Sequence, residues 1–361
     1  MRLLYVSRWW AHHDIRFAEA WRANGVEFVA LAADGTAPGD SSYSGDSLEV
    51  RLKRAIREFQ PDVIHAGPLT DIAPLVCSIW AGPLIAMSWG FDLMHEIDLD
   101  SEARERARYA ISRADQIIVD NNGPRGRAIE LGASEDAIVQ FAWGVDLSFY
   151  TPGESNFRVE HSIPNDATLI LSTRKHEAIY CVTDVVDAFI IAAQSIPTVH
   201  LAVVGSGALT DQLRSIISLA HLESRTTFVG DLDPIALRGV YRAADLYVSA
   251  SSVDGTSISL LEAIACGTPV SVSRIPGNAE WVDDTTGINF KQGDTAELAR
   301  IFEQLGSRSE DFSSHTLKRS ICALQRVRAR ADWAITVRRL EGIAREAISR
   351  VRVIADVETS R

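Results

Sequence analysis

The sequence predicts an α/β protein in which two doubly wound, Rossmann-like domains follow one another along the chain. Short, continuous apolar runs, typical of parallel strands covered on both faces, alternate with segments whose apolar residues recur at helical spacing. This alternation occurs in two series, which the turn-rich stretch 151–154 separates. The length of 361 residues also suits two cores better than one. We therefore expect domains at residues 1–152 and 153–330, followed by a helical segment at 331–361.

Six strands are expected in the first domain. The apolar runs that predict them cover residues 3–7, 27–33, 62–66, 84–88, 116–120 and 138–142. After the first run, Asp14 is a candidate helix cap and Gly25 a candidate helix end. Apolar residues at helical spacing from Leu48 to Phe59 predict the next helix, which Pro61 closes.

The second domain repeats the alternation of strands and helices. Its expected strands are residues 168–172, 200–204, 226–229, 245–249 and 269–273, and its expected helices include 183–196, 208–219, 234–244 and 257–266. From about residue 313 the pattern is helical and rich in arginine. Ligands of such sheets bind beyond the carboxyl ends of the strands. We therefore expect the site in the loops that follow strands, in a cleft between the two domains.

The charge balance argues against several classes of partner. The formal net charge is −12, from 48 acidic and 36 basic residues. Broad electrostatic binding to nucleic acid or to anionic lipid is therefore not expected. The four cysteines, Cys77, Cys181, Cys266 and Cys322, form no CxxC pair. They predict inert thiols in a reducing compartment, with neither a disulfide framework nor a zinc site.

No targeting or membrane segment is expected from the sequence. The apolar run near the N-terminus meets Arg8 too soon for a signal peptide. No stretch approaches the ~20 apolar residues of a membrane span. The prediction is a cytoplasmic protein without a transmembrane segment, and the oligomeric state is left open.

The most informative segment runs from Ser249 to Val270 and reads as strand, loop, helix, stop and strand. Thr256 or Ser257 can cap the helix, whose free N–H groups form a ready-made phosphate site. Asp254 precedes this helix and Glu262 lies inside it. Two carboxylates beside a phosphate site are expected if hydroxyl-rich groups flank the phosphate, because a carboxylate accepts hydrogen bonds from a diol.

This segment resembles the signature of glycosyltransferase family 4, retaining enzymes with the GT-B fold. The matching motifs are Asp254-x7-Glu262, Leu261-Glu262-Ala263, Gly267-Thr-Pro-Val270 and Pro276-Gly-Asn-Ala-Glu280. The resemblance extends from Met1 to about Phe302. It implies two Rossmann-like domains with an interdomain cleft, an acceptor-binding first domain, a donor-binding second domain, and a C-terminal helix that returns to the first.

The resemblance also implies roles for individual residues on the donor side. Glu262 would hold the donor ribose, and Asp254 would contact hydroxyls of the donor sugar. Arg174 would neutralise phosphate charge. Backbone N–H groups would hold the diphosphate at Gly255, Thr256, Ser257 and Ile258. The remaining donor-side candidates are Gly205, Val229 and Tyr180.

Two donor-side positions depart from the family pattern. The first acidic residue of the signature is Asp254 where the family usually has Glu, so its reach to the sugar is shorter by one methylene. Six residues after Arg174, where the family usually has Lys, stands Tyr180. A weaker positive clamp on the diphosphate, or one supplied elsewhere, is expected. Lys175 is interpreted as a solvated side chain.

Candidate acceptor-side residues follow strands of the first domain. The loop after the first strand carries Trp9, Trp10 and His13, where relatives often have glycines. Its aromatic rings could form a stacking wall for an acceptor, and packing between domains is the other interpretation. The loop after the fourth strand carries Trp89 and Asp92, where many relatives have His-Gly-x-Asp.

His65 ends the third strand on the side of the predicted cleft. A lone histidine at such a place is either a structural strand-end residue or a group that touches substrate. We include it as a catalytic candidate with Asp254 and Arg174.

The predicted reaction is retaining transfer of a hexose-type sugar from a nucleoside diphosphate donor to an acceptor hydroxyl. Helix N–H groups and Arg174 would stabilise the leaving diphosphate. The resemblance implies front-face attack and no metal or other cofactor, and no metal-ligand spacing is present. The donor (UDP-, GDP-, ADP- or dTDP-sugar) and the acceptor (a small molecule, glycan or secondary metabolite) stay open.

Three other functions are compatible with two α/β domains. Asp254, Tyr180 and Trp89 at altered positions motivate a pseudo-glycosyltransferase that binds a nucleotide sugar without transfer. A nucleotide-sugar epimerase on the same plan is the second. A dinucleotide-dependent dehydrogenase is the third, and it is disfavoured because no GxGxxG motif follows a strand.

Overall fold

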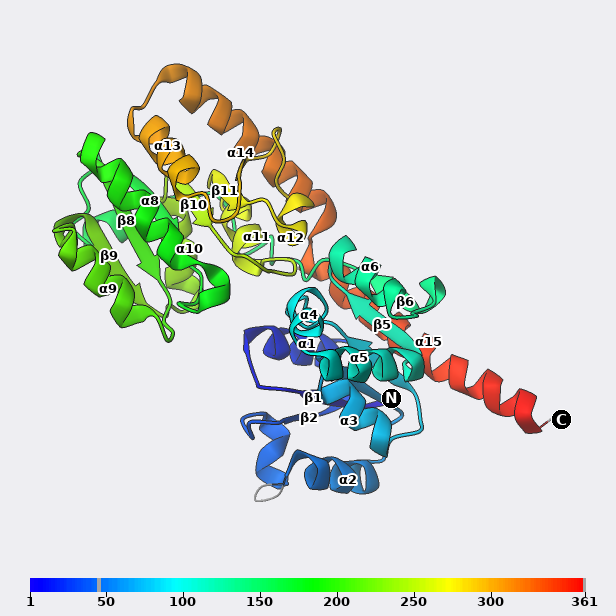
Figure 1. The fold of residues 1–361 in the computed structure, drawn as a ribbon. Coiled ribbons are helices and arrows are strands. Elements are labelled where there is room, and N and C mark those ends of the chain that lie inside the picture. Colours follow the sequence, from blue (N-terminus) through cyan, green and yellow to red (C-terminus); the bar gives the residue numbers. More distant parts are fainter. Residues whose placement is uncertain (44–46, 360–361) are drawn as a thin grey trace. The chain divides into compact units, whose positions relative to one another are not determined.

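The computed structural model describes residues 1–43 and 47–359. The chain divides into two compact units (Figure 1). Unit 1 consists of Met1–Ala142 and Ala334–Arg361, and unit 2 consists of Trp143–Trp333. Each is an α/β unit built on a sheet of six parallel strands.

The expected boundary at residue 152 lies about ten residues too late. Residues 143–152 belong to unit 2 because their backbone is bound there. Val145 N–H donates to the Ala331 carbonyl at 2.8 Å, and Arg242 Nε donates to the Thr151 carbonyl at 2.7 Å. The turn residues that marked the boundary are therefore held inside the second unit.

The sheet of unit 1 has the strand order β2-β1-β3-β4-β5-β6. Its strands are β1 (Arg2–Ser7), β2 (Glu27–Ala32), β3 (Val63–Gly67), β4 (Leu84–Met87), β5 (Gln116–Val119) and β6 (Ile138–Gln140). The order reverses between β1 and β3, so the loops after these two strands lie at the switch point of the sheet, where ligands of such folds bind.

Several helices of unit 1 begin at capping residues that the sequence supplies. They are α1 (His12–Ala23), α2 (Leu48–Phe59), α3 (Ile72–Ile79), α4 (Ile97–Leu99), α5 (Ser101–Arg113), α6 (Asn122–Glu130) and α15 (Trp333–Thr359), with the shorter η1 (Pro38–Ser42), η2 (Asp92–Glu96) and η3 (Glu135–Ala137). Side chains of Ser47, Asp71 and Asp100 cap α2, α3 and α5. Asp14 lies inside α1 and accepts from Ala11 N–H at 2.7 Å, so α1 begins earlier than predicted.

The core of unit 1 packs one face of the sheet against four helices. Buried side chains of α2, α3, α5 and α6 contact apolar residues of the strands, as Leu52, Val76 and Ala107 do. Helix α15 is bound to the same unit, because Asn24 Nδ2 donates to the Val337 carbonyl at 2.8 Å. Helix α15 therefore belongs to unit 1.

Unit 2 has the strand order β12-β11-β10-β7-β8-β9. Its strands are β7 (Thr168–Ser172), β8 (Val199–Val204), β9 (Thr226–Gly230), β10 (Leu246–Ser249), β11 (Val270–Ser273) and β12 (Ile288–Phe290). Its helices are α7 (Phe157–Glu160), α8 (Val182–Ser195), α9 (Thr210–Leu219), α10 (Pro234–Ala243), α11 (Ile258–Ala265), α12 (Pro276–Ala279), α13 (Thr295–Gly306) and α14 (Glu310–Arg330), with η4 (Ala178–Tyr180) and η5 (Glu223–Arg225). A core cluster of buried residues joins the sheet to α8, α9 and α13.

The eleven predicted strands match these bounds within two residues at each end. Strand β12 was missed because Asn289 interrupts its short apolar run, whereas β6, equally short, is followed by further apolar residues. In the sheet, β7 lies between β8 and β10, so the order reverses between β7 and β10. The loops after β7 and β10 thus lie at the switch point of unit 2.

Candidate functional site

The switch point of unit 2 brings an arginine and an aspartate together. Arg174 follows β7 and Asp254 follows β10. Arg174 Nη2 lies 2.7 Å from Asp254 Oδ2, and Nη1 donates to Ser257 Oγ at 2.7 Å and to Ser259 Oγ at 3.0 Å. The arginine side chain is 10% exposed and the aspartate side chain 15%. The pair is therefore largely withdrawn from water but still reachable from solvent.

Burial and charge act against each other in this pair. Burial alone would lower the pKa of Arg174, but Asp254 and neighbouring phenol groups hold that pKa above its usual value. Burial raises the pKa of Asp254, and Arg174 and Ser257 offset this only in part. The Tyr180 ring also faces the guanidinium, with Arg174 Cζ 4.3 Å from its centroid. Arg174 thus remains a fixed positive charge.

Helix α11 begins beside this pair. Ser257 precedes the helix and makes no side-chain capping hydrogen bond, since its hydroxyl binds Arg174 instead. Thr256 and Ser257 are buried, whereas Ile258 is half-buried. The first turn of a helix has free N–H groups and a positive dipole end. The arrangement can hold an anion between the start of α11 and the Arg174 guanidinium.

The turn at Pro276 fixes the loop that carries Asp254. A side chain at Gly277 would place its Cβ 2.2 Å from the Gly255 carbonyl oxygen and 2.6 Å from that of Asp254. Only a glycine lets the two loops approach this closely. The Pro-Gly-Asn part of the motif therefore acts through packing on residues 254 and 255.

Glu262 lies inside α11 and is bound by a tyrosine that the sequence did not point to. The Tyr241 hydroxyl, on α10, donates to Glu262 Oε2 at 3.0 Å. Glu262 is 7% exposed and Tyr241 is fully buried. Burial, with the nearby Glu262, holds the pKa of Tyr241 well above its usual value. The phenol therefore stays protonated and fixes the orientation of the carboxylate.

A second tyrosine supports the serines at the start of α11. Tyr247, on β10, lies with its hydroxyl 2.9 Å from Ser259 Oγ, and Ser259 contacts Ser257 at 3.2 Å. Tyr247 belongs to the Ala-Asp-Leu-Tyr-Val-Ser run that precedes the motif, but only the fold turns its hydroxyl toward the site. Neither Tyr241 nor Tyr247 was predicted as a site residue.

The glycine loop after β8 packs on the Arg174 loop. At Gly205, where φ is +113°, a Cβ would lie 3.0 Å from the Arg174 carbonyl oxygen. Gly205 N–H donates to the Gly230 carbonyl at 2.7 Å. Val229 precedes Gly230 in the edge strand β9 and is half-buried. The structure thus places Gly205 against Arg174 and holds Val229 two strands away from the switch point.

In unit 1, aromatic rings lie at the carboxyl ends of β1 and β4. Trp9 is 39% exposed and stacks on Phe91, with ring centroids 6.2 Å apart. Trp10 is half-buried and packs edge-on against Tyr5. Arg8 Cζ lies 5.3 Å from the Trp9 ring and 5.4 Å from the Phe91 ring. Trp9 and Phe91 therefore form an accessible aromatic surface beside a guanidinium, and Phe91 was missed from the sequence.

The other acceptor-side candidates are more enclosed. The His13 ring packs edge-on against Trp89, and its Nε2 lies 3.2 Å from Asp14 Oδ2. The Trp89 side chain packs on Gly67, where a Cβ would lie 2.5 Å from the indole Nε1. A side chain at Gly67 would clash with the Trp89 indole, which explains why a glycine ends β3.

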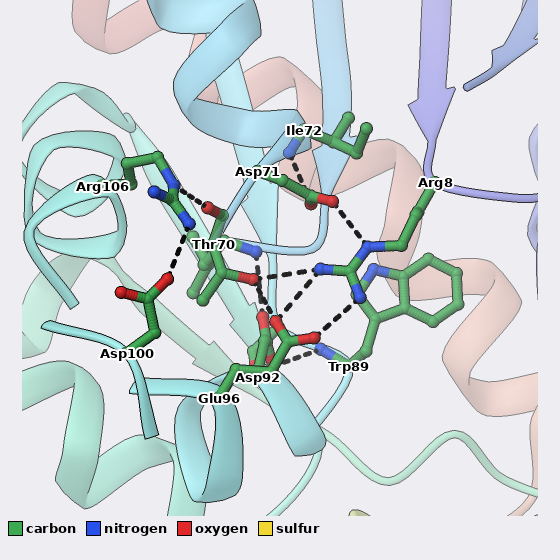
Figure 2. A network of polar contacts seen from close by, with 11 residues as sticks. Arg8, Thr70, Asp71, Ile72, Trp89, Asp92, Glu96, Asp100 and Arg106 are labelled. Carbon is green, nitrogen blue, oxygen red and sulfur yellow. Dashed lines mark hydrogen bonds and ion pairs between the residues drawn. The ribbon is translucent and has the colours of Figure 1, made fainter. Parts of the chain in front are cut away.

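Asp92 is a buried scaffold group rather than an exposed acceptor contact. It has no exposed surface and accepts from Ser88 Oγ at 2.7 Å, Leu69 N–H at 2.9 Å and Trp89 N–H at 3.0 Å. Burial raises its pKa to about 6. Its three donors belong to the loops after β3 and β4, so Asp92 ties those loops together (Figure 2).

Of the two interpretations of His65, the structure supports the structural strand-end residue and not the catalytic candidate. It is fully buried, with Trp21 Nε1 donating to Nδ1 at 3.3 Å and with Tyr5 and Phe17 edge-on to its ring. Burial lowers its pKa to about 3. A group with no exposed surface cannot touch a substrate, and the cause is the aromatic side chains that α1 lays over the end of β3.

Within residues 1–43 and 47–359, no group of three or more His, Cys, Asp or Glu side chains lies together in a way that could hold a metal ion. The same described residues contain no helix that is both long and apolar enough to cross a bilayer.

The family model described as Glycosyl transferases group 1 matches residues 154–315. A D-inositol 3-phosphate glycosyltransferase of Saccharomonospora viridis is 27% identical over 212 residues, covering 55% of this chain and 49% of that protein. One from an Arthrobacter species is 29% identical over 279 residues, covering 72% and 66%. A 2-deoxystreptamine N-acetyl-D-glucosaminyltransferase of Streptomyces fradiae is 34% identical over 110 residues, covering 30% and 26%. The chain thus spans about half to two thirds of the length of these inositol-phosphate relatives.

Solved structures match the whole chain. Anabaena Alr3699/HepE in complex with UDP-glucose superposes with a TM-score of 0.77 at 18% identity, covering 97% of this chain and 100% of that one. The sucrose-phosphate synthase of Thermosynechococcus elongatus gives a TM-score of 0.73 at 15% identity and covers 100% of both chains. Identities this low report the fold, which is GT-B. Residues 154–315, which lie within unit 2, thus match the Glycosyl transferases group 1 family, and the fold of the chain is GT-B.

Proposed function

We propose that this protein transfers a sugar from a nucleoside diphosphate donor to an acceptor hydroxyl, with retention at the anomeric carbon. The observation that carries the proposal is the convergence of Arg174, Asp254 and the start of α11 at the switch point of unit 2. A positive group, a helix N-terminus and a carboxylate in one place suit a diphosphate bonded to a hydroxyl-rich group.

The donor diphosphate would bind between Arg174 and the first N–H groups of α11. These N–H groups belong to Gly255, Thr256, Ser257 and Ile258. Arg174 Nε is buried without a hydrogen-bond partner within the described part of the chain, and the two Nη atoms bind Asp254, Ser257 and Ser259, so a phosphate would replace some of these partners. As the sugar–phosphate bond breaks, negative charge grows on the diphosphate and both groups stabilise it. We propose that they supply the positive charge that a divalent metal supplies in other transferases.

Glu262 would bind the hydroxyls of the donor ribose. Its carboxylate accepts from the Tyr241 hydroxyl, and a carboxylate is the group that accepts hydrogen bonds from both hydroxyls of a vicinal diol. Asp254 would contact the donor sugar once Arg174 has turned to the phosphate. The acceptor would bind on unit 1, where Trp9 and Phe91 present an aromatic surface.

Nucleotide binding by calorimetry tests the proposal directly. UDP, GDP, ADP and dTDP would be titrated into wild type, Glu262→Ala, Glu262→Gln and the exposed control Glu160→Ala. UDP is the first choice because the similar Anabaena structure contains UDP-glucose. We expect one nucleotide to bind. Its affinity should fall by roughly tenfold or more in Glu262→Ala, which corresponds to the loss of about one charged hydrogen bond. The affinity of the control should not change. A folded Glu262→Ala protein that binds like wild type would disprove the donor placement.

The closed Arg174–Asp254 pair also favours a second candidate, a protein that binds a nucleotide sugar without transferring it. Incubation with the donor that binds best separates the two, with and without EDTA and with a panel of acceptors. Transfer, or slow hydrolysis that keeps the anomeric configuration, supports the enzyme. Donor binding without a transfer or hydrolysis product supports the non-transferring protein. A product with inverted anomeric configuration rules out retention. Loss of activity with EDTA rules out metal independence.

A further inference from the structure

A cavity of about 330 Å³ opens in unit 1 at the carboxyl edge of its sheet. Its walls come from the loops after β1 and β3, from the end of η2, from α4 and from α5. The lining residues are Arg8, Thr70, Asp71, Glu96, Leu99, Asp100, Ala103 and Arg106. This volume lies at the small end of ligand sites and suits a compact ring. Leu99 and Ala103 give it an apolar wall against which a ring face can pack.

Most of the guanidinium hydrogen-bond donors that line this cavity already bind protein groups. Arg8 Nε donates to Asp71 at 2.6 Å, and its two Nη atoms bind both oxygens of Glu96 at 2.8 and 3.0 Å. Burial would lower the pKa of Arg8, but these carboxylates hold it above its usual value. Arg106 Nε donates to the Thr70 carbonyl at 2.7 Å and its Nη2 to Asp100 at 3.3 Å. Figure 2 shows both guanidinium groups turned toward these protein partners.

Acceptor capacity, in contrast, is left over. A carboxylate has about four lone-pair positions. Asp71 accepts from Arg8 and from Ile72 N–H, and Asp100 accepts from Arg106 and from the backbone N–H groups of Glu102 and Ala103. Their side chains are 39% and 50% exposed. Three carboxylates and two guanidinium groups line the cavity, so its formal charge is −1.

We propose that this cavity binds a compact polyhydroxylated ring that carries an ammonium group. Hydroxyl and ammonium groups bring the donors that the wall lacks, and the positive charge balances the excess carboxylate. A phosphate brings only acceptors and negative charge to a wall whose formal charge is already negative. The proposal rests on the proposed function in one respect: the ring would be the acceptor, or the part of it nearest the reacting hydroxyl.

Three monosaccharides that differ in charge provide the test. D-glucosamine, D-glucose and D-glucose 6-phosphate would be titrated into the full chain at about pH 6, where an amino group is protonated. We expect glucosamine to bind about tenfold more tightly than glucose, the equivalent of one charged hydrogen bond, and the phosphate to bind most weakly. Asp100→Asn and Asp71→Asn should each reduce the preference for glucosamine, and the exposed Asp166→Asn in unit 2 should not.

The two asparagine variants keep their fold because the amide oxygen still accepts the helix-capping hydrogen bond. Equal binding of the three sugars, a preference for the phosphate, or no binding at tens of millimolar would overturn the proposal. A preference that survives both variants would overturn it as well.

Titration of UDP into the same samples separates this proposal from the proposed function. UDP binding without a glucosamine preference overturns the acceptor class alone. A glucosamine preference that depends on Asp100, in a protein that binds no nucleotide, overturns the transferase function and leaves the cavity as a cation-selecting ligand site.

Discussion

Arg174 Nη2 lies 2.7 Å from Asp254 Oδ2, at the place where the diphosphate of the donor is proposed to bind. The Asp254 carboxylate therefore binds the same guanidinium group that the donor phosphate would need. Under the proposed function, donor binding and this ion pair compete, and Asp254 would act as an internal counter-ion to Arg174. The pair keeps a buried cation neutralised until the ligand arrives.

The first prediction concerns Asp254→Asn. Removal of the competing charge should raise the affinity for the nucleoside diphosphate by about three- to tenfold, while transfer from the sugar donor falls by at least about tenfold, on the scale of a charged hydrogen bond. Calorimetry and a coupled assay on the same protein measure the two effects. An unchanged nucleotide affinity would mean that the pair stays closed in the complex.

Arg174→Lys and Arg174→Ala form a graded pair. Lysine keeps the charge but loses the planar fork, so nucleotide affinity should fall about tenfold in Arg174→Lys and about a hundredfold in Arg174→Ala. Lys175→Ala is the control, because Lys175 is the exposed neighbour. Comparable losses at positions 174 and 175 would point to general electrostatic attraction rather than a defined phosphate contact.

Gly277→Ala tests the close approach of the two loops. Its Cβ would meet the Gly255 carbonyl oxygen at 2.2 Å, so the loop must shift and the free energy of unfolding should fall by about 1–3 kcal/mol. Nucleotide affinity should fall with it. Gly126→Ala in α6 is a matched control, since its Cβ meets nothing within 4 Å and alanine favours a helix. Chemical denaturation of both variants decides the matter.

His65 predicts a pH dependence of stability rather than of catalysis. Its pKa falls from 6.5 to about 3 on folding, so the unfolded chain binds more protons between these values. The neutral imidazole's contribution is complete above pH 6.5 and is lost as the pH falls toward 3, by up to about 4 kcal/mol.

Denaturation of wild type and His65→Leu between pH 4 and pH 7 reveals this contribution. The stability of wild type relative to the variant should increase with pH across the window. Parallel curves for the two proteins would show that the imidazole titrates normally and is not enclosed by Tyr5 and Trp21.

Both sheets were predictable because a strand buried on two faces is an uninterrupted apolar run. The run at 168–172 coincides with β7, and the loop that contains Asp254 followed from the strand, glycine and helix signals around it. The convergence of Arg174 and Asp254 then follows from the strand order, which places β7 beside β10.

The remaining features of the site depend on side-chain direction, which a linear pattern does not encode. Tyr241 and Tyr247 look like core residues of a helix and a strand, yet each sends its hydroxyl to the site. His65 could be read as a substrate contact or as a structural residue, and only the fold shows that helix α1 covers it. Arg8 pairs with Glu96, which lies 88 positions later in the sequence. Helix or strand periodicity predicts no contact over such a separation.

Unit 1 is assembled from the two ends of the chain, and this sets an order for its synthesis. The ribosome produces residues 1–142, then all of unit 2, and only afterwards the segment from Ala334 onward. Until then the Asn24 amide lacks the Val337 carbonyl and Phe141 lacks the guanidinium of Arg339. The first domain therefore stays incomplete while the second is synthesised. Its last helix then docks onto a sheet whose final strand left the ribosome some two hundred residues earlier.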